Sequence, residues 1–506
     1  MTGAAHPRAE IAARLRAVPR GVVVVLAAFF AVRIAYWITG GGFSTTMLRG
    51  SWQLLDIEEL AAHPLQSVTL LHIQPPLFNL FVGSALRWNP FPDAITFQIL
   101  YLAFGLVMVL TLRLLLIALA FPAFAATTGA VVIAINPILL SYENTITYEY
   151  PVAMLLVLAA LACARYSAGR SLRWLVGFIG ALTAVVLTRA LLHPVWLVAA
   201  TVLIIAAVRP RARWPQIVGV LLIPLVLVGG VFLKNQLMFD EPTMSSWFGM
   251  NLGRGVIASM PREDIDALIA SGDLSPAARV APFSDYSVFA EFFGPCRTEF
   301  TQPVLRSLTR SDGVSNLNAA CYLPVYDDAQ TNALHAIAER PGVYLRQRWP
   351  SLVQHFSLPP VDDLAPGISR FGSNRVLESI GRAYEVALID LPLPIDDRGW
   401  AVPVYSQGTR YDVHFSLVLL LGTLLVGVRA AVGGVALLRR RGRTHSVPWV
   451  FIGLTVMYVA VVSIATEYGE NQRFRVLTDP LVLGILAAQL AALLPLARKS
   501  GPNSGP

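Results

Sequence analysis

The chain has 506 residues, of which 55% are hydrophobic and only 14% are charged, and its formal net charge is +8. Soluble globular proteins average about 25% charged residues, so this composition excludes a purely soluble protein and requires contact with lipid. Among the 39 basic residues only Lys234 and Lys499 are lysines, and the arginines cluster between apolar runs. That pattern is typical of membrane-protein loops and argues against nucleic acid as a partner.

Ten apolar runs predict transmembrane helices. The first, residues 21–38, follows a basic segment and lacks a small-residue cleavage site, which predicts an uncleaved helix with a cytoplasmic N-terminus. The other runs cover residues 95–112, 115–139, 151–164, 174–187, 195–208, 217–232, 415–438, 447–464 and 476–494. Several are shorter than the roughly 20 residues needed to cross hydrocarbon, so the helices can extend beyond the predicted ends by about one turn.

A further apolar segment, residues 72–88, decides the topology. If it crossed the membrane, the basic loops 165–173, 209–213 and 439–443 would all lie outside, against the positive-inside rule. We therefore predict that this segment is juxtamembrane, which agrees with its early Pro75 and Pro76. The three basic loops and the C-terminus then lie in the cytoplasm.

The same topology places the polar segments on one outer face. The longest, residues 234–412, is rich in Pro, Asp, Ser and aromatic residues and is long enough to fold as a domain. The predicted fold class is an all-α polytopic membrane protein with an inserted extracytoplasmic domain, α/β or mixed. This domain follows a transmembrane core (1–233) with a first outer loop (40–93), and it precedes C-terminal helices (413–497) and a tail (498–506).

Two features of the inserted stretch predict local structure. Cys296 and Cys321 would face an oxidising compartment, where they form either a disulfide or two unpaired thiols. Residues 341–356 begin with proline and set apolar side chains among arginines. They predict either an amphipathic helix on the bilayer or an ordinary domain helix.

The first outer loop carries three carboxylates, Asp56, Glu58 and Glu59, and then a segment that contains His72 and Gln74. On a helix, Asp56 and Glu59 would share one face. A carboxylate at the mouth of a membrane cavity can act as a general base that accepts a proton from an attacking hydroxyl. The alternative is a solvated acidic turn.

Further motifs follow at predicted outer helix ends. They are Asn136-Pro137 with Tyr148-Glu149-Tyr150-Pro151, Lys234-Asn235 with residues 245–253, and Glu470-Asn471-Gln472-Arg473-Phe474-Arg475 with Asp479-Pro480. Together with the acidic loop and its Pro-Pro-Leu-aromatic segment, they resemble the GT-C superfamily of integral-membrane glycosyltransferases. That group includes the lipid A aminoarabinose transferases and protein O-mannosyltransferases, which use sugars carried on polyprenyl phosphate.

The resemblance implies roles for individual carboxylates. Asp56 matches the proposed catalytic base of the relatives in its spacing to the Pro-Pro segment, but Ile57 interrupts their usual Asp-Glu pair, so Glu58 and Glu59 remain competitors. Glu149 matches a second acidic group better than Glu143 does. Some relatives hold a divalent cation among such carboxylates, whereas no diagnostic ligand spacing occurs in this sequence.

The departing lipid phosphate requires cations, because negative charge develops on it. Arg189 and His193 are four residues apart and would share a helix face, and Arg473 and Arg475 supply a second pair. The alternatives are snorkelling for Arg189 and, for the other two arginines, bracing ion pairs with Glu467 or Glu470. His72, Gln74, Glu149, Asn235 and Glu470 are the candidates for the acceptor side of the cavity, with a structural, hydrogen-bonded His72 as the alternative.

These features predict an inverting glycosyltransferase on the outer face of a bacterial cytoplasmic membrane, with both termini in the cytoplasm. Its donor would be a polyprenyl-phosphate sugar, and its acceptor an envelope glycan, lipid or protein. A ligase or polymerase of lipid-diphosphate glycans and a transporter or flippase are the rival functions. Transporters usually carry ionisable groups near the midplane and repeated halves, neither of which this sequence displays.

Overall fold

The computed structural model describes residues 19–208, 214–258, 260–358, 379, 382–384, 386–395, 411–439 and 443–494. Six described helices are long and apolar enough to cross a membrane, and a bent pair adds a seventh span. The six are α2 (Arg20–Ile38), α7 (Asp93–Ala118), α10 (Glu149–Gly169), α13 (Trp214–Phe239), α21 (Leu417–Leu438) and α22 (Arg443–Thr466). Three shorter apolar helices are α11 (Leu172–Thr188), α12 (Pro194–Val208) and α24 (Asp479–Leu493).

Each of the ten predicted apolar runs overlaps one of these helices or the bent pair. The chain is thus a polytopic helical membrane protein, as the sequence predicts. The predicted tail, residues 498–506, and the basic loop at 209–213 lie outside the described residues.

The bent pair corrects the prediction of one continuous span at residues 115–139. Helix α7 continues to Ala118, and the pair α8 (Ala123–Ala134) and α9 (Pro137–Glu143) follows with a bend of 56°. Proline cannot continue the backbone hydrogen-bond ladder, so Pro137 starts a new helix. Asn136 caps this helix by accepting hydrogen bonds from the amides of Ile138 and Leu139, at 2.9 and 3.1 Å.

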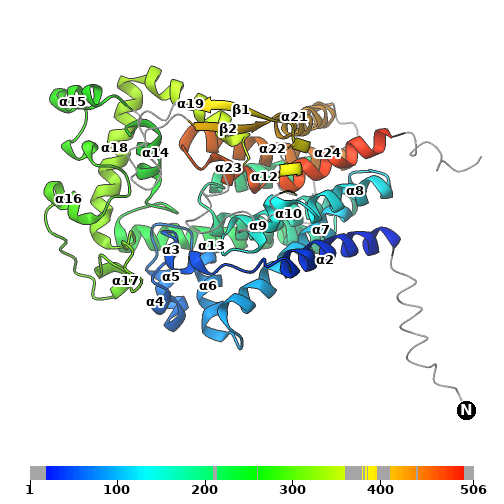
Figure 1. The fold of residues 1–506 in the computed structure, drawn as a ribbon, viewed down its shortest axis with the longest axis horizontal. Coiled ribbons are helices and arrows are strands. Elements are labelled where there is room, and N and C mark those ends of the chain that lie inside the picture. Colours follow the sequence, from blue (N-terminus) through cyan, green and yellow to red (C-terminus); the bar gives the residue numbers. More distant parts are fainter. Residues whose placement is uncertain are drawn as a thin grey trace, which may run out of the picture.

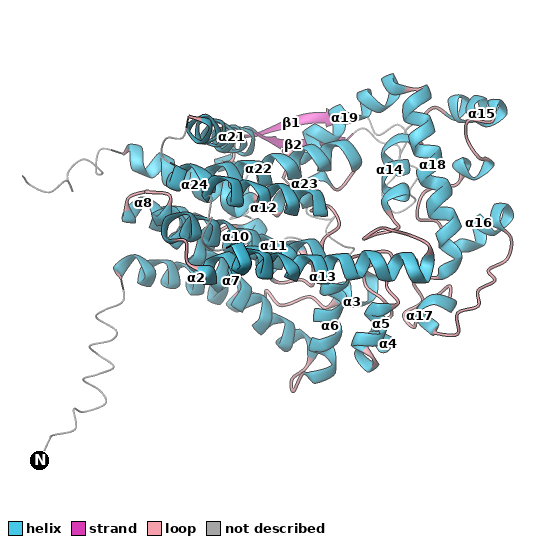
Figure 2. Ribbon diagram, turned by 180° about the vertical axis from the view of Figure 1, so that it is seen from behind, coloured by secondary structure: helices cyan, strands magenta, loops and turns pink. Residues whose placement is uncertain are grey.

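The apolar helices run side by side along the long axis of the molecule, and the inserted domain lies beyond one end of them (Figure 1). The same arrangement is visible from behind, where α14 to α18 stand apart from the bundle of α2, α7, α10, α11 and α24 (Figure 2). The loops that contact this domain follow α11, α13 and α22. Several polar segments that the sequence assigns to one membrane face therefore gather at one end of the bundle.

The first outer loop is mostly helical. It forms α3 (Thr46–Gly50), α4 (Ile57–Ala62), α5 (Pro64–Thr69) and α6 (Pro76–Trp88). Helix α6 has 13 residues, too few to cross hydrocarbon, and it packs on α4 and α5. The Asn79 amide fixes this packing because it accepts from the Leu55 amide at 2.9 Å and donates to the Gln53 carbonyl at 3.0 Å.

The inserted domain is more helical than the α/β or mixed fold that the sequence predicts. Its helices are α14 (Phe248–Val256), α15 (Arg262–Ser271), η2 (Pro276–Arg279), α16 (Tyr286–Phe293), α17 (Pro303–Arg306), η3 (Ala320–Tyr322), α18 (Leu323–Glu339) and α19 (Pro341–His355). Within the described residues the sheet is limited to an antiparallel pair, β1 (Asp390–Ile395) and β2 (Tyr411–Ser416). Apolar side chains of α14, α15 and α18 form a small buried core in this domain.

The domain boundaries also shift from the predicted 234 and 412. Helix α13 continues to Phe239, and β2 runs to Ser416 before α21 begins. Cys296 and Cys321 form a disulfide, which confirms that alternative of the sequence prediction. The loop of 25 residues that it closes is expected to stabilise the domain by about 3 kcal/mol through the entropy of the unfolded chain.

Helix α19 joins the domain to the bundle. It contacts α22 and α23 (Asn471–Val476), and Arg348 donates to the carbonyls of Ile464 and Ala465 at 2.8 and 2.9 Å. Leu345 and Trp349 are about two-thirds exposed on its other side. The predicted helix is therefore present and carries both an anchored face and an exposed apolar face.

Candidate functional site

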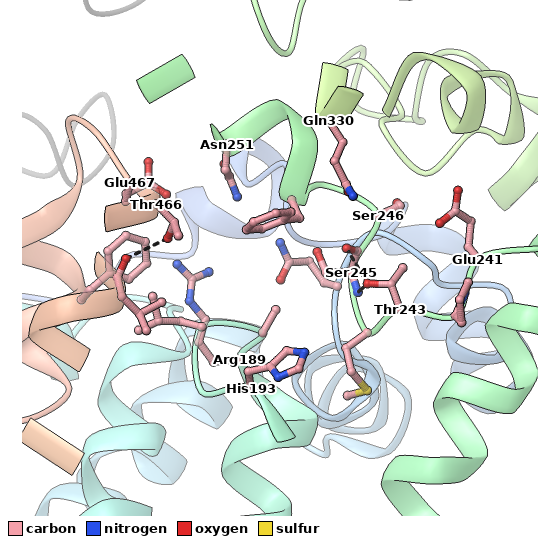
Figure 3. A pocket seen from close by; sticks show the side chains of 18 of the residues that line it. Arg189, His193, Glu241, Thr243, Ser245, Ser246, Asn251, Gln330, Thr466 and Glu467 are labelled. Atoms are coloured by element: carbon pink, nitrogen blue, oxygen red, sulfur yellow. Dashed lines mark hydrogen bonds between the residues drawn. The ribbon is translucent and has the colours of Figure 1, made fainter. Parts of the chain in front are cut away.

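A cavity of about 560 Å³ lies where the membrane helices meet the inserted domain. The core side comprises Gln74, Arg189, Ala190, Leu191, His193, Tyr458, Val462, Thr466, Glu467 and Phe474; the domain side comprises Glu241, Pro242, Thr243, Met244, Ser245, Ser246, Phe248, Asn251, Asp327 and Gln330. In Figure 3, Arg189 and His193 rise from the core, with Glu467 on one side and Glu241 on the other. Core and domain thus enclose the cavity together.

Arg189 is a buried cation that the described structure leaves without an anionic partner. Its guanidinium carbon lies 4.4 Å from the ring centre of Tyr148 and 4.5 Å from that of Phe474. The side chain is only 7% exposed, and its Nε has no hydrogen-bond partner. Aromatic faces attract a cation but cannot replace the hydrogen bonds that water would provide. The two rings therefore hold the Arg189 guanidinium in place, and its Nε–H group remains available as a hydrogen-bond donor.

His193 and Gln74 line the same cavity as Arg189. The sequence predicts Arg189 and His193 on one helix face, but this prediction is wrong because α11 ends at Thr188 and Pro194 begins α12. The turn between the two helices still turns both side chains toward the cavity (Figure 3). Partial burial lowers the pKa of His193, so near neutral pH its imidazole is uncharged.

Arg473 and Arg475, the other predicted phosphate ligands, are engaged by the fold. Arg473 contacts Glu149 at 2.7 Å and Glu470 at 3.0 Å. Arg475 contacts Asp479 at 3.0 Å and donates to the carbonyls of His355 and Ser357. The alternative of bracing ion pairs therefore describes both arginines, although Asp479 rather than Glu467 is the partner of Arg475.

Three of the five predicted acceptor-side residues, Glu149, Glu470 and Asn235, do not line the cavity. Glu149 is fully buried. Arg473 donates hydrogen bonds to both Glu149 and Glu470. Burial opposes ionisation of Glu470, but the charges of Arg473, Arg254 and Arg189 outweigh it and lower its pKa. The Asn235 amide donates to the Thr243 carbonyl at 2.6 Å and thereby holds the segment that forms the domain wall.

His72 has the structural role that the sequence left as its alternative. It is completely buried, and its ring nitrogens contact the Ser246 hydroxyl at 2.9 Å and the Asn318 carbonyl at 3.0 Å. Burial lowers the pKa of His72 to about 3, so the imidazole is neutral. The residue ties the first outer loop to the domain behind the cavity wall.

The first-loop carboxylates Asp56, Glu58 and Glu59 do not line the cavity. Asp56 is the N-cap of α4 and accepts from the amides of Glu58 and Glu59 at 3.0 and 3.3 Å. It also accepts hydrogen bonds from the backbone amide and the hydroxyl of Ser311. Partial burial opposes ionisation, but these hydrogen bonds prevail and lower the pKa of Asp56. Both carboxylate oxygens therefore accept hydrogen bonds within the fold, and the role of Asp56 as the base stays a prediction.

Sequence reasoning missed the polar side chains of the domain wall. Glu241 and Asp327 are hydrogen-bonded to each other across a separation of 86 positions, which no local pattern reveals. Asn251, by contrast, belongs to the segment 245–253 that the sequence singles out. That motif is the one signal that could have directed attention to this wall.

Gly249 sets the spacing of the two helices that carry this wall. A Cβ atom at this position would lie 2.5 Å from the Gln330 amide nitrogen and from the Tyr326 carbonyl oxygen. Those neighbours are backbone atoms of α18, which cannot move without displacing the helix. The missing side chain thus allows α14 and α18 to pack in direct contact.

Glu467 joins the two sides of the cavity. Its carboxylate forms an ion pair with Arg254 of α14, and both side chains are buried. Among the described residues, no group of three or more His, Cys, Asp or Glu side chains is arranged to hold a metal ion.

No protein-family model matches the chain, and no curated protein matches it in sequence. Its structure is similar to the oligosaccharyltransferase of Archaeoglobus fulgidus, a GT-C-fold enzyme solved with a tethered acceptor peptide. The identity is 10% and the TM-score 0.37 over 95% of this chain, and the chain spans 52% of that protein. At this level of likeness the activity has to be argued from the chain's own residues.

Proposed function

We propose that the protein is an inverting glycosyltransferase that moves a sugar from a polyprenyl-phosphate carrier to a hydroxyl-bearing acceptor of the cell envelope. The observation that carries this proposal is Arg189, a buried guanidinium that lines the cavity and has no anionic partner among the described residues. A buried cation that lacks a direct ion pair is costly to a fold, and a ligand that provides the counter-charge removes part of that cost. A phosphate monoester fits this requirement.

The position of the cavity supports a lipid-linked donor. Arg189 follows α11, and the neighbouring wall includes Tyr458 and Val462 of the membrane-spanning helix α22. A prenyl chain that lies among the apolar helices would bring its phosphate to this level, whereas the sugar would extend toward the polar domain wall. We assign the outer face of the cytoplasmic membrane to this end of the bundle, following the positive-inside rule.

Chemically, Arg189 stabilises the phosphate as the leaving group. When the acceptor oxygen attacks the anomeric carbon, the bond to the phosphate oxygen breaks and its electron pair stays on the phosphate. A preorganised guanidinium stabilises that developing charge more than it stabilises the bound donor, which accelerates the reaction. Neutral His193 is suited to donate or accept a single hydrogen bond near the same oxygens.

The test measures donor binding and transfer by the full-length protein in nanodiscs with a polyprenyl-phosphate monosaccharide. Arg189→Gln is expected to reduce transfer about 100-fold or more, the typical effect of removing one donor to a developing oxyanion. Arg173→Gln is the matched control because Arg173 lies near the other end of α11 and also contacts an aromatic ring, Trp174, but is exposed. Its transfer should equal that of the unchanged protein.

Two results would contradict the proposal. Equal transfer by the Arg189→Gln and Arg173→Gln proteins would remove Arg189 from the phosphate site. Binding of a diphosphate-linked oligosaccharide without binding of the monophosphate-linked sugar would favour the rival ligase or polymerase function.

A further inference from the structure

We propose that Glu241, hydrogen-bonded to Asp327, is the catalytic base that takes the proton from the acceptor hydroxyl. This inference rests on the proposed function and assigns the proton transfer to the domain wall of the cavity instead of the first outer loop. Glu241 and Asp327 both line the cavity, and neither is assigned a role by the sequence motifs.

The backbone around Glu241 is fixed by the end of α13. Asp240 adopts a left-handed conformation with φ of 57°, which ends the helix abruptly. The Glu241 amide then donates to the Asn235 carbonyl at 3.3 Å, and the Glu241 carbonyl accepts from the Thr243 amide at 2.8 Å. These contacts set the direction in which the Glu241 side chain leaves the backbone, as a positioned base requires.

The partner carboxyl comes from a separate helix. Asp327 lies in the second turn of α18, and its side chain is hydrogen-bonded to that of Glu241. Two carboxyl groups make such a bond only when they share a proton. A proton on one carboxyl group can therefore be donated to the other, so the neighbouring Asp327 favours uptake of a proton by Glu241.

The environment of the pair tunes Glu241 to neutral pH. Partial burial, the hydrogen bond and charge of Asp327, and the charge of Asp240 together raise the pKa of Glu241 to about 7. The other ionisable groups of the cavity are Arg189, His193 and Glu467, on the core side. A base with a pKa near the working pH combines a useful ionised fraction with a strong affinity for the proton.

Arg189 supplies the independent observation that these carboxyls face a ligand site. It lines the same cavity, is more than nine-tenths buried, and has an Nε without a hydrogen-bond partner. In Figure 3 it points into the space that separates Glu467 from Glu241. An inverting displacement needs a proton acceptor beside the nucleophile and a cation beside the leaving group, and the two walls provide one each.

The step balances without a further reactant. The acceptor oxygen forms a bond to the anomeric carbon while the bond from that carbon to the phosphate oxygen breaks. The hydroxyl proton moves to the ionised Glu241 carboxylate, and the leaving phosphate keeps the electron pair. Release of the proton to solvent through the Asp327 pair resets the base.

The first experiment compares Glu241→Gln with Glu263→Gln in the full-length protein, using the polyprenyl-phosphate sugar as donor. Glu263 is an exposed carboxylate in the first turn of α15, so its variant controls for loss of one charge from the domain. We expect a loss of about 100-fold or more in kcat for Glu241→Gln, with donor binding kept, because general-base catalysis typically contributes that much. Glu263→Gln should leave kcat unchanged.

The second experiment records the pH dependence of kcat/KM. Transfer should rise as the pH increases through about 7, because only ionised Glu241 accepts the proton. Asp327→Asn removes a negative charge beside Glu241, so the rising limb should move to lower pH. A purely structural role for Asp327 would instead lower the rate equally at every pH.

The outcomes separate this inference from the proposed function. If Glu241→Gln transfers sugar at the rate of the unchanged protein, or the Asp327→Asn limb stays in place, the base assignment is overturned while the glycosyltransferase stands. If the unchanged protein neither binds nor transfers the donor, the proposed function itself fails.

Discussion

The segment around α23 and the wall of the cavity both carry arginines at the same end of the helix bundle, yet the fold treats them differently. Arg473 and Arg475 reach carboxylates within 3.0 Å, whereas Arg189 lies between two aromatic rings. Around α23 the charges cancel and hold segments together. At the cavity, Arg189 contacts two aromatic rings and has no ion pair with a described side chain. The difference teaches that the partner of an arginine, rather than its presence at a membrane surface, indicates its role.

The largest effect should come from breaking the α23 brace. Arg475→Met leaves Asp479 buried without its partner and removes two hydrogen bonds to backbone carbonyls. Loss of one partner from a buried ion pair costs about 3–5 kcal/mol in the free energy of unfolding. Thermal unfolding in detergent should show a strongly lowered melting temperature, and an unchanged melting temperature would contradict the bracing role.

A double substitution sharpens the same contrast at Arg473. Arg473→Met alone should destabilise the protein by a similar amount, because Glu149 is completely buried. Adding Glu149→Gln removes the stranded charge and should recover a large part of the lost stability. A double variant less stable than the single one would show that the pair does not act as a unit.

A smaller effect is expected in the first outer loop. Asp56→Ala removes the cap of α4 and should cost about 1 kcal/mol of stability. Because the pKa of Asp56 is lowered in the folded protein, its contribution is present above the unfolded value of about 3.9 and disappears as the pH falls through the folded value. Melting temperatures of the variant and the unchanged protein should therefore converge as the pH falls through that folded value.

Asp56→Asn tests whether Asp56 is the catalytic base, because the amide oxygen can still accept a hydrogen bond and cap α4 in part. Sugar transfer should stay within about threefold of the unchanged protein, far from the loss of 10²-fold or more expected for a base. A loss of that size with an unchanged melting temperature would return the base to the first loop.

The smallest effect on stability should follow from Arg189→Met. The substitution removes an attraction to two aromatic rings of at most about 2 kcal/mol, but it also removes the cost of burying an unpaired cation. The two terms oppose each other, so the free energy of unfolding should change by less than about 1 kcal/mol. A loss as large as that of Arg475→Met would mean that Arg189 braces the fold as well.

The features that the sequence predicts well are local. Apolar runs identify the helices because burial in lipid depends on composition over a short window. The break before Pro137 was not predicted, because the apolar composition continues across it. Arg189 and His193, which the sequence groups by a helical spacing, both line the cavity, although α11 ends at Thr188 and that spacing does not exist.

The features that escaped prediction depend on distant pairs. The brace of Arg473 requires Glu149, more than 300 positions away, and the pairing of Glu241 with Asp327 depends on how α18 packs on the end of α13. A carboxylate in a loop also looks the same in sequence whether it caps a helix or faces a cavity, so the sequence does not reveal the cap that Asp56 provides. Only the folded structure shows which of its oxygens are already occupied.

Gly249 has a consequence for how this chain can vary. Even the smallest side chain at this position would collide with the backbone of α18, the helix that carries Asp327. Substitution of Gly249 is therefore excluded sterically, whereas exposed residues of α15 can be substituted without such a collision. Related chains that keep α14 packed directly on α18 should therefore keep glycine at this position.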